Sequence, residues 1–280
     1  MNRLPKEDRA RILHLLCEGS SIRAITRMTG ASKNTVAKLL RDAGCAVAAF
    51  QDEALRNLKC ERVQVDEIWS FMGSKEKNAS AEKKAQGNGD CWTWTALCAD
   101  TKLLLSWSVG SRDADSGDTF MADVASRLAN RVQLTSDGHK AYLQAVDNAF
   151  GKNIDYAMLV KVYGKAFEGS VRYSPPECLG CKRTKITGNA DKDHVSISYV
   201  ERSNLTIHTH TRRFTRLTNA FSKKIENHIH AVALHCMYYN FVRIHRTLRV
   251  TPAMAAGVTS KLWEISDIVA LVEKAELQSN

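Results

Sequence analysis

Residues Arg62 to Phe71 read RVQVDEIWSF, an apolar and β-prone stretch that carries two adjacent acids, Asp66 and Glu67, in its middle. Its Val, Ile, Trp and Phe residues favour a strand that packs on at least one buried face. A carboxylate inside such a strand costs free energy unless something pairs with its charge. The stretch therefore predicts a buried strand whose acid has a specific partner.

The segments around this strand predict an α/β domain. In chain order we expect strands at 62–72, 90–100 and 103–111, a helix at 116–129, a strand that ends at Asp137-Gly138, a short helix, a strand at 156–164, and helix from 199 to about 246. This order suggests a ribonuclease-H-like mixed sheet flanked by helices.

Three acids fit the positions at which that fold carries its carboxylates: the central first strand, the end of the fourth strand and a later helix. They are Asp66, Asp137 and Glu201. Brought together without a partner, they would repel and raise one another's pKa, and a divalent cation removes that repulsion. Mg²⁺ and Mn²⁺ prefer carboxylate oxygens. We therefore predict that these catalytic acids hold two Mg²⁺ or Mn²⁺ ions, about 4 Å apart, around a scissile phosphodiester.

Each acid also has a plainer interpretation. Adjacent strand residues face opposite sides, so only one of Asp66 and Glu67 is expected to enter the site, and Asp66 is favoured. Asp137 precedes a glycine, and Asp-Gly is a common turn dipeptide. Glu201 lies near a predicted helix start, where a carboxylate is favourable in any protein.

Residues 1–44 are expected to form an all-α helix-turn-helix module, joined by a linker at 45–61 to the rest of the chain. Thr26, Gly30 and Val36 have the spacing of that motif: a small residue facing the partner helix, a glycine at the turn and a β-branched residue between the helices. The third helix is expected to close at Gly44. A plain three-helix bundle is the alternative. The exposed face that would read the DNA major groove is formed by Ser32, Lys33, Asn34 and Lys38.

Basic charge is concentrated in two segments of this 280-residue chain of net charge +10. Residues 1–44 hold nine Lys and Arg against four acids, and residues 202–249 hold nine against one. The pattern indicates two separate surfaces for a polyanion, although solubilising surface charge is an alternative. On the second segment, Asn204 and His208 share a helical face with Glu201 and are expected to contact the substrate near the metals. The arginines that follow are expected to contact phosphates of the DNA: Arg212, Arg213 and Arg216.

The segment 165–198 is rich in Gly, Pro, Ser and Lys and is expected to be a long insertion loop within a catalytic domain at 62–257. Its Cys178-x-x-Cys181 pair is half of a zinc motif, but two further ligands are missing nearby. Residues 258–280 are expected to be a helical tail. No stretch is long and apolar enough for a membrane span, so a cytoplasmic location without disulfides is predicted.

Four motifs carry a family resemblance: VDEIWSF, LTSDGHKAY, YVERSNLTIHTHTRRFTRLTNAFSKKIENHI and YNFVRIHRTL followed by TPAMAAG. Together they resemble the DDE transposases of bacterial insertion sequences, and the insertion-sequence-one family in particular, over most of residues 62–257. The resemblance implies that Asp66, Asp137 and Glu201 are the catalytic triad. It also implies a bacterial, nucleoid-associated protein that acts on double-stranded DNA. Relatives with an N-terminal cysteine zinc motif differ from this chain, which opens with the helix-turn-helix pattern.

The sequence as a whole predicts a DNA transposase that cuts at the ends of its element and joins the 3′ ends to target DNA. Because two element ends must be brought together, we expect a homodimer or larger assembly. Two alternatives remain open. One is a DNA-binding regulator with an inactive nuclease-like domain, and the other is a ribonuclease-H-fold nuclease that cleaves without strand transfer.

Overall fold

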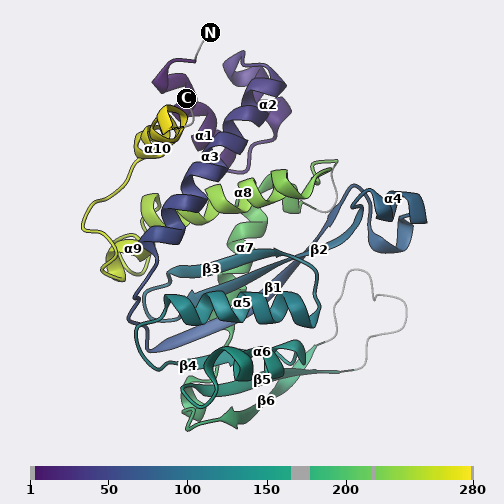
Figure 1. The fold of residues 1–280 in the computed structure, drawn as a ribbon, viewed down its shortest axis with the longest axis vertical. Coiled ribbons are helices and arrows are strands. Elements are labelled where there is room, and N and C mark those ends of the chain that lie inside the picture. The colour runs from purple at the N-terminus through teal and green to yellow at the C-terminus, as the bar shows by residue number, and fades with distance from the viewer. Residues whose placement is uncertain (1–3, 165–176, 216–218, 279–280) are drawn as a thin grey trace.

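The computed structural model describes residues 4–164, 177–215 and 219–278, and within them one mixed sheet forms the centre of the molecule (Figure 1). The strand order is β3-β2-β1-β4-β5-β6. β1 is antiparallel to β2 and parallel to β4, β4 is parallel to β5, and β6 is antiparallel to β5. The predicted mixed α/β architecture is therefore confirmed. The strands are β1 (Arg62–Met72), β2 (Gly89–Cys98), β3 (Leu104–Gly110), β4 (Gln133–Ser136), β5 (Asp155–Tyr163) and β6 (Cys178–Thr187).

Helices cover both faces of this sheet, and the alternation of side chains along β1 divides them between two cores. Val63 and Val65 belong to the same buried cluster as residues of α5 (Ala114–Arg127) and α6 (Ala141–Phe150). Ile68 belongs instead to a cluster with α7 (Ser198–His210) and α8 (Ile225–Met237). Strand β1 is thus buried on both sides, as its nearly continuous apolar sequence requires.

The N-terminal helices are α1 (Lys6–Cys17), α2 (Ile22–Thr29) and α3 (Lys33–Ala54), and α3 is longer than the sequence suggested. Gly30 ends α2 in the left-handed conformation, as expected for a turn glycine. Gly44, by contrast, does not end α3. A Cβ atom at Gly44 would lie 2.4 Å from the Cβ of His230 on α8, so glycine is needed there for close helix packing. The predicted stop at Gly44 was therefore wrong, while the domain limits at 1–44 and 45–61 stay a prediction.

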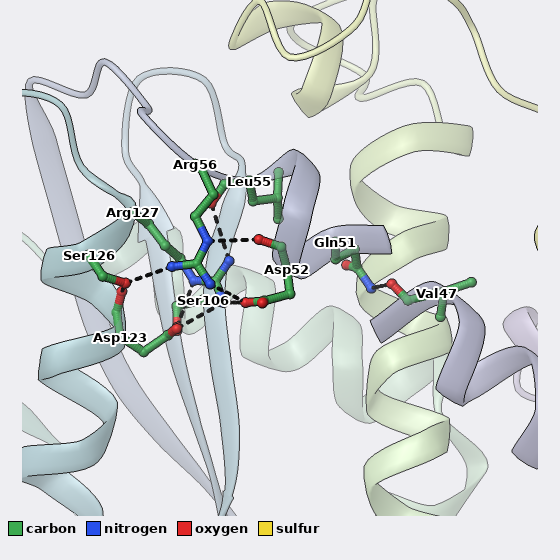
Figure 2. Close-up of polar contacts among 9 residues, drawn as sticks. All are labelled: Val47, Gln51, Asp52, Leu55, Arg56, Ser106, Asp123, Ser126 and Arg127. Carbon is green, nitrogen blue, oxygen red and sulfur yellow. Dashed lines mark hydrogen bonds and ion pairs between the residues drawn. The ribbon is translucent and has the colours of Figure 1, made fainter. Parts of the chain in front are cut away.

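The far end of α3 is fixed to the sheet domain by two arginines and two aspartates, which we call the arginine network (Figure 2). The buried Arg127 of α5 donates to Asp123 at 2.6 Å, to Asp52 of α3 at 2.8 Å and to the Leu55 carbonyl at 3.2 Å. Arg56 also pairs with Asp52. These bonds connect the end of α3 to α5, which packs on the sheet.

The C-terminal helix α10 (Ile265–Gln278) returns to the N-terminal helices (Figure 1). Val272 is buried in the same cluster as Ile12 of α1, and Arg9 of α1 pairs with Glu276 at 2.7 Å. The short helix α9 (Pro252–Ala255) precedes it. Residues 258–280 were expected to be a helical tail; among the described residues, 265–278 are helical but pack as a component of the core, and 258–264 are not helical.

Three local predictions need correction. Residues 178–187 were expected in a loop but form the edge strand β6, whose exposed side chains leave no apolar pattern to read; residues 165–176 of that segment lie outside the described residues. The expected helix from 199 to 246 is not continuous: α7 ends at His210 and α8 begins at Ile225, and the described residues between them, 211–215 and 219–224, include a short 3₁₀ turn, η3 (Arg212–Phe214). The expected loop between β1 and β2 contains η1 (Glu76–Asn78) and α4 (Ala81–Ala85).

Helix α8 is buried on two faces. Val232 and Cys236 face the sheet cluster, while Ala231 and Leu234 belong to the cluster that contains α3. A π-helical turn, η4 (Tyr238–Val242), follows directly. The side chain of its Asn240 bonds both the N–H and the carbonyl of Leu104 on β3. A further 3₁₀ turn among the described residues, η2 (Lys192–His194), precedes α7.

Among the described residues, no helix has both the length and the apolar character that crossing a bilayer would require.

Candidate metal centre

Asp66 lies in the middle of β1 and faces helix α7. Its Oδ2 accepts a hydrogen bond from the Asn204 Nδ2 amide at 2.9 Å. The Asn204 Oδ1 in turn accepts from the Thr95 hydroxyl of β2 at 2.9 Å. Because Asn204 is buried and held by a second strand, it fixes the orientation of the Asp66 carboxylate.

Glu67 points to the opposite side of β1, among α5, α6 and the segment that precedes α5. Its side chain is only 1% exposed. The Arg112 Nη2 lies 3.1 Å from Glu67 Oε2, and the Tyr142 hydroxyl of α6 lies beside the same carboxylate. Arg112 itself rests over the ring of Trp92.

Asp137 follows the last residue of β4 and lies close to both Asp66 and Glu67, although these two acids are on opposite sides of β1. The register pairs Gln64 with Thr135, and two residues further along the same register Asp137 comes beside Asp66. Since β4 ends at Ser136 while β1 continues, Asp137 is not confined to one face of the sheet. Its Oδ1 accepts the His139 backbone N–H at 2.8 Å.

Carboxylate oxygens of Asp66, Glu67 and Asp137 lie within 4.8 Å of one another, and we call these three residues the carboxylate cluster. Asp66 and Asp137 are thus brought together as the sequence suggested. The expectation that only one of the adjacent β1 acids could enter the site was wrong. The longer Glu67 side chain reaches Asp137 past the end of β4, a convergence that strand alternation alone does not reveal.

The electrostatics show a cluster with too little positive charge. Burial raises the pKa of Asp66 to about 6, and repulsion by Asp137 and Glu201 adds to the shift. Burial and repulsion by Asp137 raise the pKa of Glu67 to about 7, even though Arg112 acts in the opposite sense. Arg112 is 35% exposed and lies 3.7 Å from Asp137, so it offsets only part of the negative charge. An added cation would stabilise the ionised cluster.

Glu201, the third predicted ligand, lies outside the carboxylate cluster. It is on α7, close enough for its charge to raise the pKa of Asp66, and it forms an ion pair with Lys161 of β5. The structure therefore places four acids in the area, with Glu67 in the cluster and Glu201 held by a lysine.

Asn204 and His208, the two α7 residues predicted to contact the substrate, have different surroundings. Asn204 uses its amide for Asp66 and Thr95, so it supports the cluster from below the surface. The His208 ring packs against Phe214 with 5.3 Å between the ring centroids. Asn204 and His208 lie on α7, the same helix as Glu201.

The predicted reading face of α3 is exposed at its start, but the four side chains differ in their contacts. The Ser32 hydroxyl caps the helix by accepting the Thr35 N–H at 3.1 Å. Lys38 pairs with Asp42 one turn later. Lys33 and Asn34 line a cavity next to α8.

The predicted phosphate contacts beyond α7 reach the same cavity. Arg212 and Arg213 both line it, and the Arg213 Nη1 donates to the Ser222 hydroxyl at 3.0 Å. Arg216 lies outside the described residues. The two basic segments, expected to form separate surfaces, therefore meet in one cavity.

The Cys178-x-x-Cys181 pair, the other candidate metal site from the sequence, is not part of a cluster of metal ligands among the described residues. Cys178 and Cys181 are exposed on β6. Within the described part of the chain, the carboxylate cluster is the one group of three or more acids, cysteines or histidines arranged to hold a metal ion.

Sequence reasoning missed two residues of the centre. Arg112 and Tyr142 touch Glu67 from segments that are distant in the chain. Arg112 lies in no motif, and Tyr142 ends the motif LTSDGHKAY but was given no role. Glu67 was considered but not favoured.

Comparison with known proteins leaves the family open. No protein-family model matches the chain, and no curated protein sequence matches it. Among solved structures, a similar chain occurs in a piggyBac transposase synaptic complex with hairpin DNA, determined by cryo-EM, with a TM-score of 0.41 and 9% sequence identity. The alignment covers 98% of this chain and 73% of that chain. A likeness at this level assigns neither a family nor a function, so the function has to be argued from the site.

Proposed function

We propose that this chain is a DNA transposase of the DDE type, which cleaves DNA at the ends of its element and joins the 3′ ends to target DNA. The observation that carries the proposal is the convergence of Asp66, Glu67 and Asp137 from β1 and the end of β4. We further propose that the sheet is ribonuclease-H-like, because that fold carries carboxylates on its first strand and after its fourth. The resemblance of the motifs to insertion-sequence transposases supports the same assignment.

The carboxylate cluster has the chemistry of a magnesium or manganese site. All of its donors are carboxylate oxygens, the ligands that these hard cations prefer. Burial is the main cause of the raised pKa values of Asp66 and Glu67, and repulsion by Asp137 adds to it, so a bound cation would favour the ionised carboxylates. Asp66 and Asp137, with Glu67 or Glu201, would hold the ions. When bound, a pair of such ions activates the attacking oxygen of a water or a 3′-hydroxyl and stabilises the leaving oxygen.

The chain's own residues orient and balance this centre. Asn204 holds the Asp66 carboxylate in one direction, and the His139 backbone N–H does the same for Asp137. Such supporting hydrogen bonds typically change metal affinity 10- to 100-fold in other proteins. Arg112 places a positive charge beside Glu67 and Asp137, where it offsets part of their repulsion.

Double-stranded DNA is the proposed substrate, bound by an assembly of two or more copies. The excess of Lys and Arg in segments 1–44 and 202–249 supports binding to the phosphate backbone. We propose that the helices α2 and α3 act as the DNA-reading part, with Ser32, Lys33, Asn34 and Lys38 on that side.

The test is strand transfer in vitro, with Mg²⁺ or Mn²⁺ and the DNA that flanks the reading frame as donor. Wild type should join labelled 3′ ends to a target plasmid, whereas Asp66→Asn and Asp137→Asn should lose joining and keep DNA binding. Glu76→Gln, an exposed acid between β1 and β2, is the matched control and should join as wild type does. Unimpaired joining by either cluster variant would overturn the proposal.

The same assay decides which acid completes the centre. Loss of joining in Glu201→Gln, with Glu67→Gln still active, would support the triad that the motifs suggest. The reverse result would assign the role to Glu67 and leave Glu201 as the partner of Lys161.

A regulator that binds DNA without cutting it is the second candidate. The observation that favours it is the Lys161–Glu201 pair, since a lysine already neutralises one of the acids. Metal-independent, operator-like binding with no nicking at any Mn²⁺ concentration would support this candidate.

A further inference from the structure

Arg112 is a basic side chain in direct contact with the carboxylate cluster. Its Nη2 lies 3.1 Å from Glu67 Oε2 and 3.7 Å from Asp137 Oδ2. Both acids belong to the cluster that is proposed to hold divalent cations. Because like charges at such short range repel, Arg112 and a bound cation would compete for the same carboxylates.

Most of the hydrogen-bonding capacity of Arg112 is unused. A guanidinium has five N–H donors, and Arg127 of the arginine network uses its own group in four hydrogen bonds. Within the described part of the chain, Arg112 makes one hydrogen bond, from Nη2 to Glu67. Its side chain is 35% exposed, so the group is open to a second partner beside the cluster.

The backbone on each side of Arg112 is held in place. The Ser111 carbonyl accepts the Trp94 indole N–H at 2.9 Å, and the Asp113 side chain caps α5. The guanidinium carbon of Arg112 lies 4.6 Å from the centroid of the Trp92 ring. Because this attraction depends on the face of the ring and not on directed hydrogen bonds, the guanidinium can turn toward another partner while it stays over the ring.

A phosphate is the anion that suits this position. The planar fork of an arginine matches two phosphate oxygens through parallel N–H bonds, which a lysine cannot reproduce. In the proposed reaction, the scissile phosphodiester lies at the carboxylate cluster and therefore next to Arg112. A phosphate at this place would replace Glu67 and Asp137 as the partner of Arg112 once their charge is balanced by a cation.

We propose that Arg112 is a phosphate-binding residue of the metal centre, which exchanges its carboxylate partners for a DNA phosphate when a divalent cation occupies the cluster. In the metal-free protein, Arg112 offsets the charge of Glu67 and Asp137 and competes with the cation. In the loaded protein, its guanidinium stays over Trp92 and binds a phosphate of the strand to be cut. Contact between Arg112 and DNA therefore depends on the cation.

This inference rests on the proposed function in taking DNA as the substrate, and it adds a substrate contact to the charge balance already described for Arg112. Both experiments below use the full chain and measure affinities, so neither requires cleavage or joining. Failure of strand transfer would overturn the transposase and leave both measurements valid.

The first experiment titrates the protein with Mn²⁺ in the absence of DNA, followed by electron paramagnetic resonance. Arg112→Gln should raise the Mn²⁺ affinity about fivefold, the upper end of the effect of a partly exposed ion pair. Arg112→Lys keeps the positive charge and should bind Mn²⁺ as wild type does. Arg131→Gln is the control, since Arg131 precedes β4 whereas Asp137 follows it, and it should leave the affinity unchanged.

The second experiment measures, by fluorescence anisotropy, binding to a short duplex taken from the DNA that flanks the reading frame. It is done with saturating Ca²⁺, which also binds carboxylate oxygens, and again with a chelator. With Ca²⁺, Arg112→Gln should lower the slope of log K against log salt by about 0.9, the contribution of one phosphate contact in duplex DNA. With the chelator, the slope should equal that of wild type, because Glu67 and Asp137 then hold Arg112.

An unchanged or reduced Mn²⁺ affinity in Arg112→Gln would overturn the inference, because Arg112 would then not compete with the cation. A slope lowered equally with Ca²⁺ and with the chelator would also overturn it, since the DNA contact would not depend on the cation. An unchanged slope in both conditions would mean that Arg112 does not bind a phosphate and only balances the charge of the acids.

Discussion

The arginine network, through Asp123, and the carboxylate cluster each contain partly buried acids, yet their electrostatics are opposite. In the network, burial raises the pKa of Asp123, but hydrogen bonds from Arg127 and Ser106 more than offset it, so its pKa lies below the ordinary value. In the cluster, the pKa of Asp66 rises to about 6 and that of Glu67 to about 7.

The difference lies in the cations that the fold supplies. The network has two arginines for two aspartates, and Arg127 donates to both. The cluster has three acids and one partly exposed arginine, Arg112, which lies 3.1 Å from Glu67 and 3.7 Å from Asp137. A fold that completes one acidic group and leaves the other short of positive charge uses the first for structure, and the second is suited to an external cation.

Replacing Arg127 is expected to have the largest effect on stability. Arg127→Ala should lower the free energy of unfolding by about 3 kcal/mol, because it leaves Asp123 partly buried without its main partner. Urea unfolding followed by circular dichroism measures the change. Arg131→Ala, which removes an exposed pair with Asp155, is the control and should lower the free energy of unfolding much less than Arg127→Ala does. Similar losses of unfolding free energy in both variants would mean that the arginine network stabilises the fold no more than an exposed ion pair does.

Glu67→Gln should have the opposite effect on stability and raise the free energy of unfolding of the metal-free protein. The folded-state pKa of Glu67 is about 7 against an ordinary value of 4.5, so its stabilising contribution is complete below about pH 4.5 and is lost as pH rises through 7. The variant should therefore be more stable than wild type at pH 8, by on the order of 2 kcal/mol, and close to wild type near pH 4.5.

Melting temperatures across this pH range measure the effect, in the presence of a chelator. Asp123→Asn is the matched control from the network and should be less stable than wild type at pH 8. A Glu67→Gln variant that is destabilised at pH 8 would contradict the view that the cluster lacks positive charge.

Asn204→Ala should weaken cation binding about 10-fold, since the Asp66 carboxylate would lose the hydrogen bond that orients it. Titration of the protein with Mn²⁺, followed by electron paramagnetic resonance, gives the affinity directly. Asn204→Asp should also weaken the hydrogen bond but add a negative charge, so the two variants separate orientation from charge. Unchanged affinity in Asn204→Ala would remove Asn204 from the support of the site.

Lys161→Gln is expected to give the smallest change. If Glu201 joins the centre when a cation binds, removal of its lysine partner should raise Mn²⁺ affinity about threefold, the size of a partly exposed ion pair. Lys161→Arg keeps the charge and serves as the control. Unchanged affinity in Lys161→Gln would indicate that Glu201 stays outside the metal centre.

Local sequence patterns predicted the elements whose residues interact mainly with near neighbours in the chain. The apolar run of β1 was located to the residue, and Gly30 ends α2 at the turn as expected. Strand β6 was missed because an edge strand with exposed side chains shows no buried period. The continuation of α3 was missed because Gly44 is a packing residue, and only its contact with His230 distinguishes it from a stop.

For the candidate site, the sequence by itself determined that Asp66 would lie within a buried strand, that Asp137 would follow a strand, and that basic charge would gather in two segments. Only the tertiary structure decided that Glu67 joins them, that Lys161 holds Glu201, and that the two basic segments meet in one cavity. The physical reason is that periodicity and capping depend on residues a few positions apart. Which charges share a site depends on strand lengths and packing between distant segments, and here it follows from β4 ending at Ser136 while β1 continues past it.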